Sequence, residues 1–164
     1  MRKPLWILLF GVLALSLSSC VIVADETFEF ESNWRRTSDG AYVFCSNKES
    51  RIFYSFRGPA PSQIQNVIET YTGIISGRVH QEQRSVNQLT YSGGRYTFEG
   101  ILTFGQNGIP QSLPAGVSQQ AIVVTPITPP TSATGFTTVT VTVITTSGFS
   151  YSGAYVYNVY SNCP

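Results

Sequence analysis

The feature that most restricts the fold of this chain is a strict alternation of apolar and polar residues. It is clearest in 136–146, where three valines alternate with threonines. A period of two residues is typical of a β-strand that buries one of its two faces. A Ser-Gly turn at 147–148 leads into a second alternating run, 149–160. The two runs therefore predict a β-hairpin.

Similar patterns predict strands in most of the remaining chain. We expect them at 28–34, 41–45, 52–57, 74–83, 86–91, 96–104 and 121–125. Four polar residues join 41–45 to 52–57, so these two strands are expected to form a second hairpin. Segment 63–72 also fits a helical spacing, but its β-branched and aromatic residues favour a strand. Gly100 lies inside a strand pattern and indicates either a bulge or a close approach.

About nine strands with almost no helical pattern predict an all-β fold, namely a single antiparallel β-sandwich, with a barrel as the alternative. Only 12% of the residues are charged, which excludes charge-driven disorder. A net charge of +1 gives no reason to expect nucleic acid as a partner. The Pro- and Thr-rich segment 126–135 is expected to be a loop within one domain, because the residues after it are too few to fold alone.

The N-terminal segment is typical of an export signal. Arg2 and Lys3 precede an apolar stretch, 5–17, that is short for a membrane of about 30 Å of hydrocarbon. The tetrapeptide LSSC at 17–20 then resembles the lipobox of bacterial lipoproteins. In that family the sulfur of the Cys takes a diacylglycerol, and cleavage leaves this Cys as the new N-terminus. The alternatives are an ordinary cleaved signal and an uncleaved anchor; in both, Cys20 would have no special role.

The resemblance, which covers residues 1–20 only, implies a signal peptide at 1–19 and a lipidated Cys20. Together with the strand patterns, it divides the chain into this signal peptide, a lipidated Cys with a tether over 20–25, and a single β domain over 26–164. Two acyl chains on one Cys would anchor the protein stably to a membrane. Because the next residue is Val rather than Asp, the family's sorting pattern implies the outer membrane in a Gram-negative bacterium. In a bacterium with one membrane, the same anchor implies the cell surface. The expected location is therefore the bacterial cell envelope.

The two other cysteines, Cys45 and Cys163, are expected to pair if Cys20 is lipidated, because exported proteins meet an oxidising compartment. Two free thiols are the alternative. One His and no CxxC pair argue against a metal site, so we expect no metal and no cofactor. The single His80 lies in a polar strand without a nucleophile motif and is expected to be an exposed strand residue, so we expect no enzyme.

Two groups of residues are candidates for ligand binding. Trp34, Arg35 and Arg36 could form a small patch for an anion or a glycan, although scattered surface arginines with the Trp in the core would look the same. Tyr151, Tyr155 and Tyr157 share one strand face and could form a stacking platform, although core packing is the stronger expectation.

The preferred interpretation is a lipid-anchored, non-catalytic β domain of the cell envelope that acts as a structural or interaction module. Its partners would be the membrane, through the anchor, and an envelope protein or glycan. The alternative is a module that binds a carbohydrate or another small ligand through its Tyr and Trp rows. An exposed row in a shallow groove would favour the alternative, whereas a buried row would favour the first interpretation.

Overall fold

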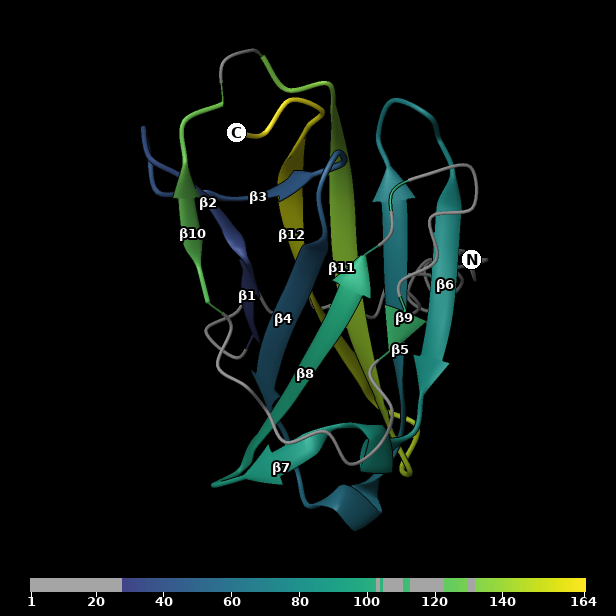
Figure 1. Ribbon diagram of the computed structural model, residues 1–164. Coiled ribbons are helices and arrows are strands. Elements are labelled where there is room, and N and C mark those ends of the chain that lie inside the picture. The colour runs from purple at the N-terminus through teal and green to yellow at the C-terminus, as the bar shows by residue number, and fades with distance from the viewer. Residues whose placement is uncertain (1–27, 103, 105–110, 113–122, 130–131) are drawn as a thin grey trace, which may run out of the picture.

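The computed structural model describes residues 28–102, 104, 111–112, 123–129 and 132–164. Within these residues the chain is all-β, and its strands form two sheets packed against each other (Figure 1). The two separate sheets match the sandwich rather than the barrel. The expected signal, the expected lipidated Cys20 and the tether at 20–25 lie outside the described residues.

The first sheet has the strand order β1-β4-β8-β7, and β9 also pairs with β8. All of its pairings are antiparallel. Its strands are β1 (Phe28–Ser32), β4 (Ser50–Arg57), β7 (Thr90–Ser92), β8 (Arg95–Leu102) and β9 (Gln111–Ser112).

The second sheet has the order β10-β2-β3-β12-β11-β5-β6. It is not wholly antiparallel, because β10 pairs with β2 and β12 pairs with β3 in parallel. Parallel neighbours need a long connection, and both pairs join segments far apart in the sequence. The strands are β2 (Trp34–Arg36), β3 (Tyr42–Cys45), β5 (Ile64–Gly73), β6 (Val79–Arg84), β10 (Thr125–Ile127), β11 (Gly135–Thr145) and β12 (Ser150–Tyr160).

The main core lies between the sheets and is built by the alternation. Val139, Val141 and Val143 of β11 are fully buried, as the sequence predicts. Aromatic rings fill much of the rest: the ring centroids of Phe56 and Tyr96 are 5.0 Å apart. Close-packed apolar side chains of this kind exclude water from both sheets and supply most of the stabilisation of a sandwich.

A second, smaller group of buried side chains lies on the other face of the second sheet. In β3, Phe44 packs in the main core, so its neighbours Val43 and Cys45 point to the opposite face. We call the group that they form the disulfide cluster. It consists of Val43, Cys45, Ile127, Tyr160 and Cys163.

Several expectations for individual strands are confirmed. The hairpin at 136–160 is present as β11 and β12, with ten paired positions. Segment 63–72 is a strand, β5, rather than a helix. Gly100 marks a close approach and not a bulge: its pairing with Ile52 is regular, and an added Cβ would lie 2.8 Å from the Phe98 ring.

Other expectations are wrong. The strands at 41–45 and 52–57 do not form a hairpin, because β3 lies in the second sheet and β4 in the first. The polar loop between them is therefore a crossover from one sheet to the other. Of the strand expected at 121–125, residues 121–122 lie outside the described residues, and the described strand is β10, Thr125–Ile127, at an edge of its sheet, where a Pro is tolerated. A 3-10 turn, Val86–Gln88, occupies half of the strand expected at 86–91.

Candidate functional site

Trp34 is a packing residue of the second sheet. It is partly buried against the disulfide cluster. Its indole Nε1 donates a hydrogen bond to the backbone oxygen of Glu49 at 3.0 Å, and the Lys48 ammonium lies 5.7 Å from the centre of the ring. The ring therefore covers the cluster from the side of the polar loop between β3 and β4.

Arg35 and Arg36, the other two candidates of this group, are held by their own turn. Arg35 Nε donates to the backbone oxygen of Gly40 at 2.8 Å. Arg36 Nε donates to Asp39 Oδ1 at 2.8 Å, and its guanidinium also contacts the Tyr160 hydroxyl. The Arg36 hydrogen bond holds the pKa of Asp39 at about 2, below its ordinary value of 3.8. The two cations thus stabilise the turn between β2 and β3 and do not converge on a shared ligand position.

The three candidate tyrosines lie on the inner face of β12. Tyr157 is fully buried, stacks on Phe44 with 4.0 Å between ring centroids, and donates its hydroxyl to the backbone oxygen of Glu31. Tyr151 and Tyr155 are partly buried and pack against phenylalanines of β1. Burial raises the pKa of Tyr151 to about 12. Core packing describes this row, and Tyr157 is not available to stack on a ligand.

The disulfide is confirmed. Cys45 and Cys163 are bonded across a sequence separation of 118 residues, with 5.8 Å between their Cα atoms. Asn47 makes two hydrogen bonds to the backbone of Cys163. Its Oδ1 accepts from the Cys163 nitrogen, and its Nδ2 donates to the Cys163 oxygen. The bond ties β3 to the residues that follow β12.

A buried ion pair, which the sequence analysis did not single out, lies between the sheets. The side chain of Glu69 is fully buried and that of Arg84 is 3% exposed. Arg84 binds both carboxylate oxygens, one of them at 3.0 Å, while Tyr54 and Tyr71 donate at 2.7 and 2.9 Å. The guanidinium carbon lies 4.1 Å from the centre of the Phe98 ring. We call Glu69, Arg84, Tyr54 and Tyr71 the Glu69 cluster.

The Glu69 cluster reaches the surface through Glu82 and His80. Glu82 accepts from Arg84 Nη2 at 2.5 Å and lies 3.2 Å from His80 Nε2. The His80 side chain is 34% exposed. Burial raises the pKa of Tyr54 and Tyr71 well above the ordinary value, so both hydroxyls stay protonated and can donate. The arrangement joins β4 to β5 and β6 with a satisfied polar network.

One signal in the sequence could have revealed the Glu69 cluster. Glu69 occupies an inward position of an alternating run, between Val67 and Tyr71. A carboxylate on the buried face of a strand requires a cationic or hydrogen-bonding partner. The identity of that partner, Arg84, follows only from the pairing of β5 with β6.

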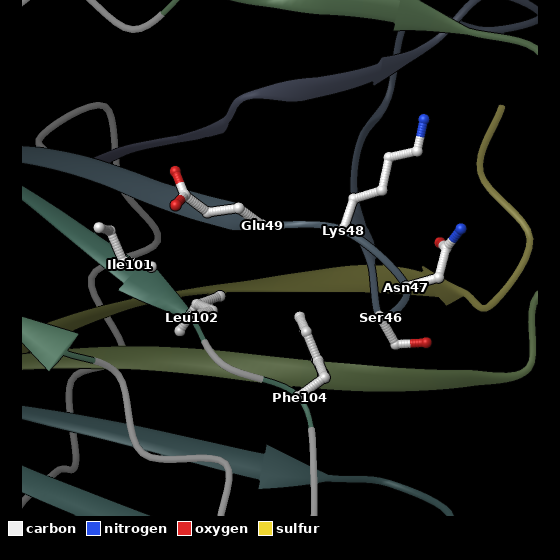
Figure 2. Close-up of a pocket in the computed structure, with 7 residues that line it drawn as sticks. All are labelled: Ser46, Asn47, Lys48, Glu49, Ile101, Leu102 and Phe104. Carbon is white, nitrogen blue, oxygen red and sulfur yellow. The ribbon is translucent and has the colours of Figure 1, made fainter.

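A surface depression of about 430 Å³ lies at the end of the sandwich that holds the disulfide (Figure 2). The polar loop between β3 and β4 lines one side, and the end of β8 with Phe104 lines the other. Figure 2 shows the Lys48 side chain directed away from Leu102 and Phe104. Its ammonium contacts the backbone oxygen of Pro164 instead, so this cation secures the chain end and does not face the depression.

Comparison of the chain with protein-family models and with curated proteins returned no match. In the described part of the chain, no group of three or more His, Cys, Asp or Glu side chains could hold a metal ion. No helix among the described residues is long and apolar enough to cross a membrane. Any assignment of function therefore depends on the sequence motifs and on the geometry given above.

Proposed function

We propose that the protein is a lipid-anchored β-sandwich of the bacterial cell envelope that acts as a non-catalytic structural or interaction module. The observation that carries the proposal is the LSSC tetrapeptide at 17–20, which ends a short apolar segment. In a Gram-negative bacterium, Val21 after the Cys favours the outer membrane over the inner membrane. The anchor would hold the sandwich at the membrane, while its other surfaces meet envelope proteins or glycans.

The disulfide supports an exported location. Disulfide bonds persist in secreted and envelope proteins, whereas cytosolic thiols are kept reduced. The Cys45–Cys163 bond leaves Cys20 as the one Cys outside the pair, in the position that a lipobox requires. Because the other two cysteines pair with each other, Cys20 remains for a separate role as the lipidated residue.

The buried residues favour a structural role over the ligand-binding alternative. That alternative needs an exposed aromatic row, and the Tyr row of β12 packs in the core instead. Glu69 and Arg84 are bound to each other and to two tyrosines, so their charge holds strands together. These contacts account for the buried ionisable side chains as structural residues, so a bound substrate is not needed to explain them.

The experiment that tests the proposal is mass spectrometry of the N-terminal peptide of the protein isolated from bacterial membranes. We expect a peptide that begins at Cys20 and carries a diacylglycerol on its sulfur. Cys20→Ala should abolish the modification and block the cleavage that leaves residue 20 as the new N-terminus. The matched control is the double variant Cys45→Ala/Cys163→Ala, which must retain the modification. An unmodified Cys20, or cleavage at another position, would refute the proposal.

A further inference from the structure

We infer that the sandwich stands on the bilayer with the end that carries the β11–β12 turn, and that Phe149 at this turn enters the lipid interface. The inference rests on the proposed lipid anchor at Cys20. It adds the orientation of the domain and a second, non-covalent contact with lipid.

The position of β1 determines which end lies near the anchor. Phe28, the first residue of β1, packs against Tyr151 at the start of β12, with 5.9 Å between ring centroids. The β11–β12 turn, β7 and the 3-10 turn Pro61–Gln63 lie at the same end, and the β5–β6 turn lies at the other (Figure 1). The chain therefore enters the sandwich beside the β11–β12 turn.

The length of the tether favours this end. Seven residues lie between Cys20 and Phe28, which gives eight Cα-to-Cα steps. They span about 16 Å as a flexible chain and about 29 Å when fully extended. Tyr151 pairs with Val143, and eight further residues lead along β11 to Gly135 at the far end, about 27 Å away. The tether would have to be nearly fully extended to turn that far end to the bilayer, with a large loss of chain entropy.

The near end carries charges of both signs. Its connecting segments, 57–63, 85–95 and 145–150, contain two arginines and no Asp or Glu. Arg57 is exposed, while Arg95 is paired with Glu29 at 2.8 Å. Glu29 of β1 thus adds a carboxylate to this end, and Asp25 and Glu26 lie just before β1 in the sequence, so the end is not predominantly cationic. The choice of this end therefore rests on the length of the tether and on the exposed aromatic side chains.

Phe149 is presented to solvent by a well-defined turn. Its side chain is 75% exposed, although Phe is usually buried. Three hydrogen bonds to Thr145 fix the backbone of Phe149. The Phe149 nitrogen donates to Thr145 Oγ1, and the Phe149 oxygen accepts from both the backbone nitrogen and Oγ1 of Thr145. Gly148, with φ of +84°, supplies the positive φ of the turn. Tyr91, at the same end, is 43% exposed. Tyr is enriched at membrane interfaces, and Phe is among the apolar residues that interfacial segments bury at the acyl boundary.

The other end supplies a matched comparison. Ile75 in the β5–β6 turn is 72% exposed, so it equals Phe149 in exposure and resembles it in hydrophobicity. Exposure alone would predict that both side chains enter the bilayer. The inference predicts that only Phe149 does, because only its end lies within easy reach of the tether.

The test measures the depth of an introduced indole. Phe149→Trp and Ile75→Trp are each combined with Trp34→Phe, since Trp34 is the one Trp after Cys20. The intact lipidated proteins are added to vesicles of phosphatidylethanolamine and phosphatidylglycerol that carry brominated acyl chains, which quench nearby indoles. We expect Phe149→Trp to lose most of its emission and to shift to the blue, while Ile75→Trp loses little. Tyr91→Trp should also be quenched and provides a second probe.

The outcomes separate this inference from the proposed function. If the protein does not float with the vesicles, the anchor is absent and both fall. If it floats but neither indole is quenched, or Ile75→Trp is quenched as strongly as Phe149→Trp, the orientation is wrong and the anchor stands. A blue shift without quenching would place a protein rather than lipid on this end, and would also overturn the inference.

Discussion

At the scale of single residues, the Glu69 carboxylate is a charge that does not meet water. The Glu69 carboxylate is bound by one guanidinium and two hydroxyl groups. Moving a carboxylate out of water is unfavourable by several kcal/mol, and only a full set of partners offsets this loss. Removing one partner therefore leaves the other buried and charged.

The first prediction concerns this pair. Glu69→Gln keeps the shape of the side chain but leaves Arg84 as a buried cation with Glu82 as its remaining ion-pair partner, and should lower the free energy of unfolding by up to about 3–5 kcal/mol. The matched control is Glu29→Gln, which breaks an ion pair whose carboxylate side chain is 58% exposed, and should change it by less than about 1 kcal/mol. Urea denaturation measures both, and equal effects would contradict the role assigned to burial.

The second prediction concerns pH. Arg36 holds the pKa of Asp39 at about 2, below the ordinary 3.8. A carboxylate with a lowered pKa in the folded state stabilises the fold fully above its unfolded pKa, and this contribution disappears as the pH falls from about 4 toward 2. Arg36→Gln should return the pKa of Asp39 toward 3.8, as followed by NMR titration of its carboxyl carbon. An unchanged titration in this variant would show that Arg36 is not the cause.

At the scale of elements, the disulfide links β3 to the residues that follow β12, its neighbour in the second sheet. β3 and β12 pair in parallel over three positions, and the last of these is Cys45 with Tyr160. The bond to Cys163 extends this short pairing beyond its end. Such a cross-link restricts the unfolded chain over more than a hundred residues.

The third prediction follows from this cross-link. Cys45→Ala/Cys163→Ala should lower the free energy of unfolding by roughly 2–5 kcal/mol, because the unfolded chain regains its freedom. Thermal and urea denaturation of the wild type with and without a thiol reductant should give a similar loss. The double variant itself serves as the control and should not respond to the reductant. A negligible loss would mean that the bond forms but does not stabilise the fold.

At the scale of the whole molecule, the two groups of buried side chains share strands. β3 contributes Phe44 to the main core and Val43 to the disulfide cluster from its opposite face. A strand that belongs to both groups cannot leave one without disturbing the other. The described sandwich is thus expected to unfold as one unit, in agreement with the single domain inferred from the sequence.

The fourth prediction tests this cooperativity. Trp34 packs on the disulfide cluster, so its fluorescence reports on that part, while far-UV circular dichroism reports on both sheets. In the mature protein the two signals should change with the same midpoint in urea, because small single domains unfold in an all-or-none transition. Two separate midpoints would indicate that the cluster around the disulfide unfolds independently.

The sequence alone determined the class of fold, most of the strands and the pair of cysteines. It could do so because alternation is a local property: each strand shows its buried face in its own residues, as in β11. The burial of Tyr157 follows from the same local pattern. The lipobox resemblance also lies within four consecutive residues, so the lipid anchor remains a prediction from sequence.

Only the tertiary structure decided which strands are neighbours. β3 lies beside β12 and β2, and not beside β4, which follows it in the chain. Strand pairing across more than a hundred residues depends on the packing of the whole core, so local sequence patterns do not predict it. The same holds for Glu69 and Arg84, whose meeting requires the register of β5 and β6. The position of a carboxylate in an alternating run does not reveal which residue binds it, because that residue is determined by strand register and by the facing sheet.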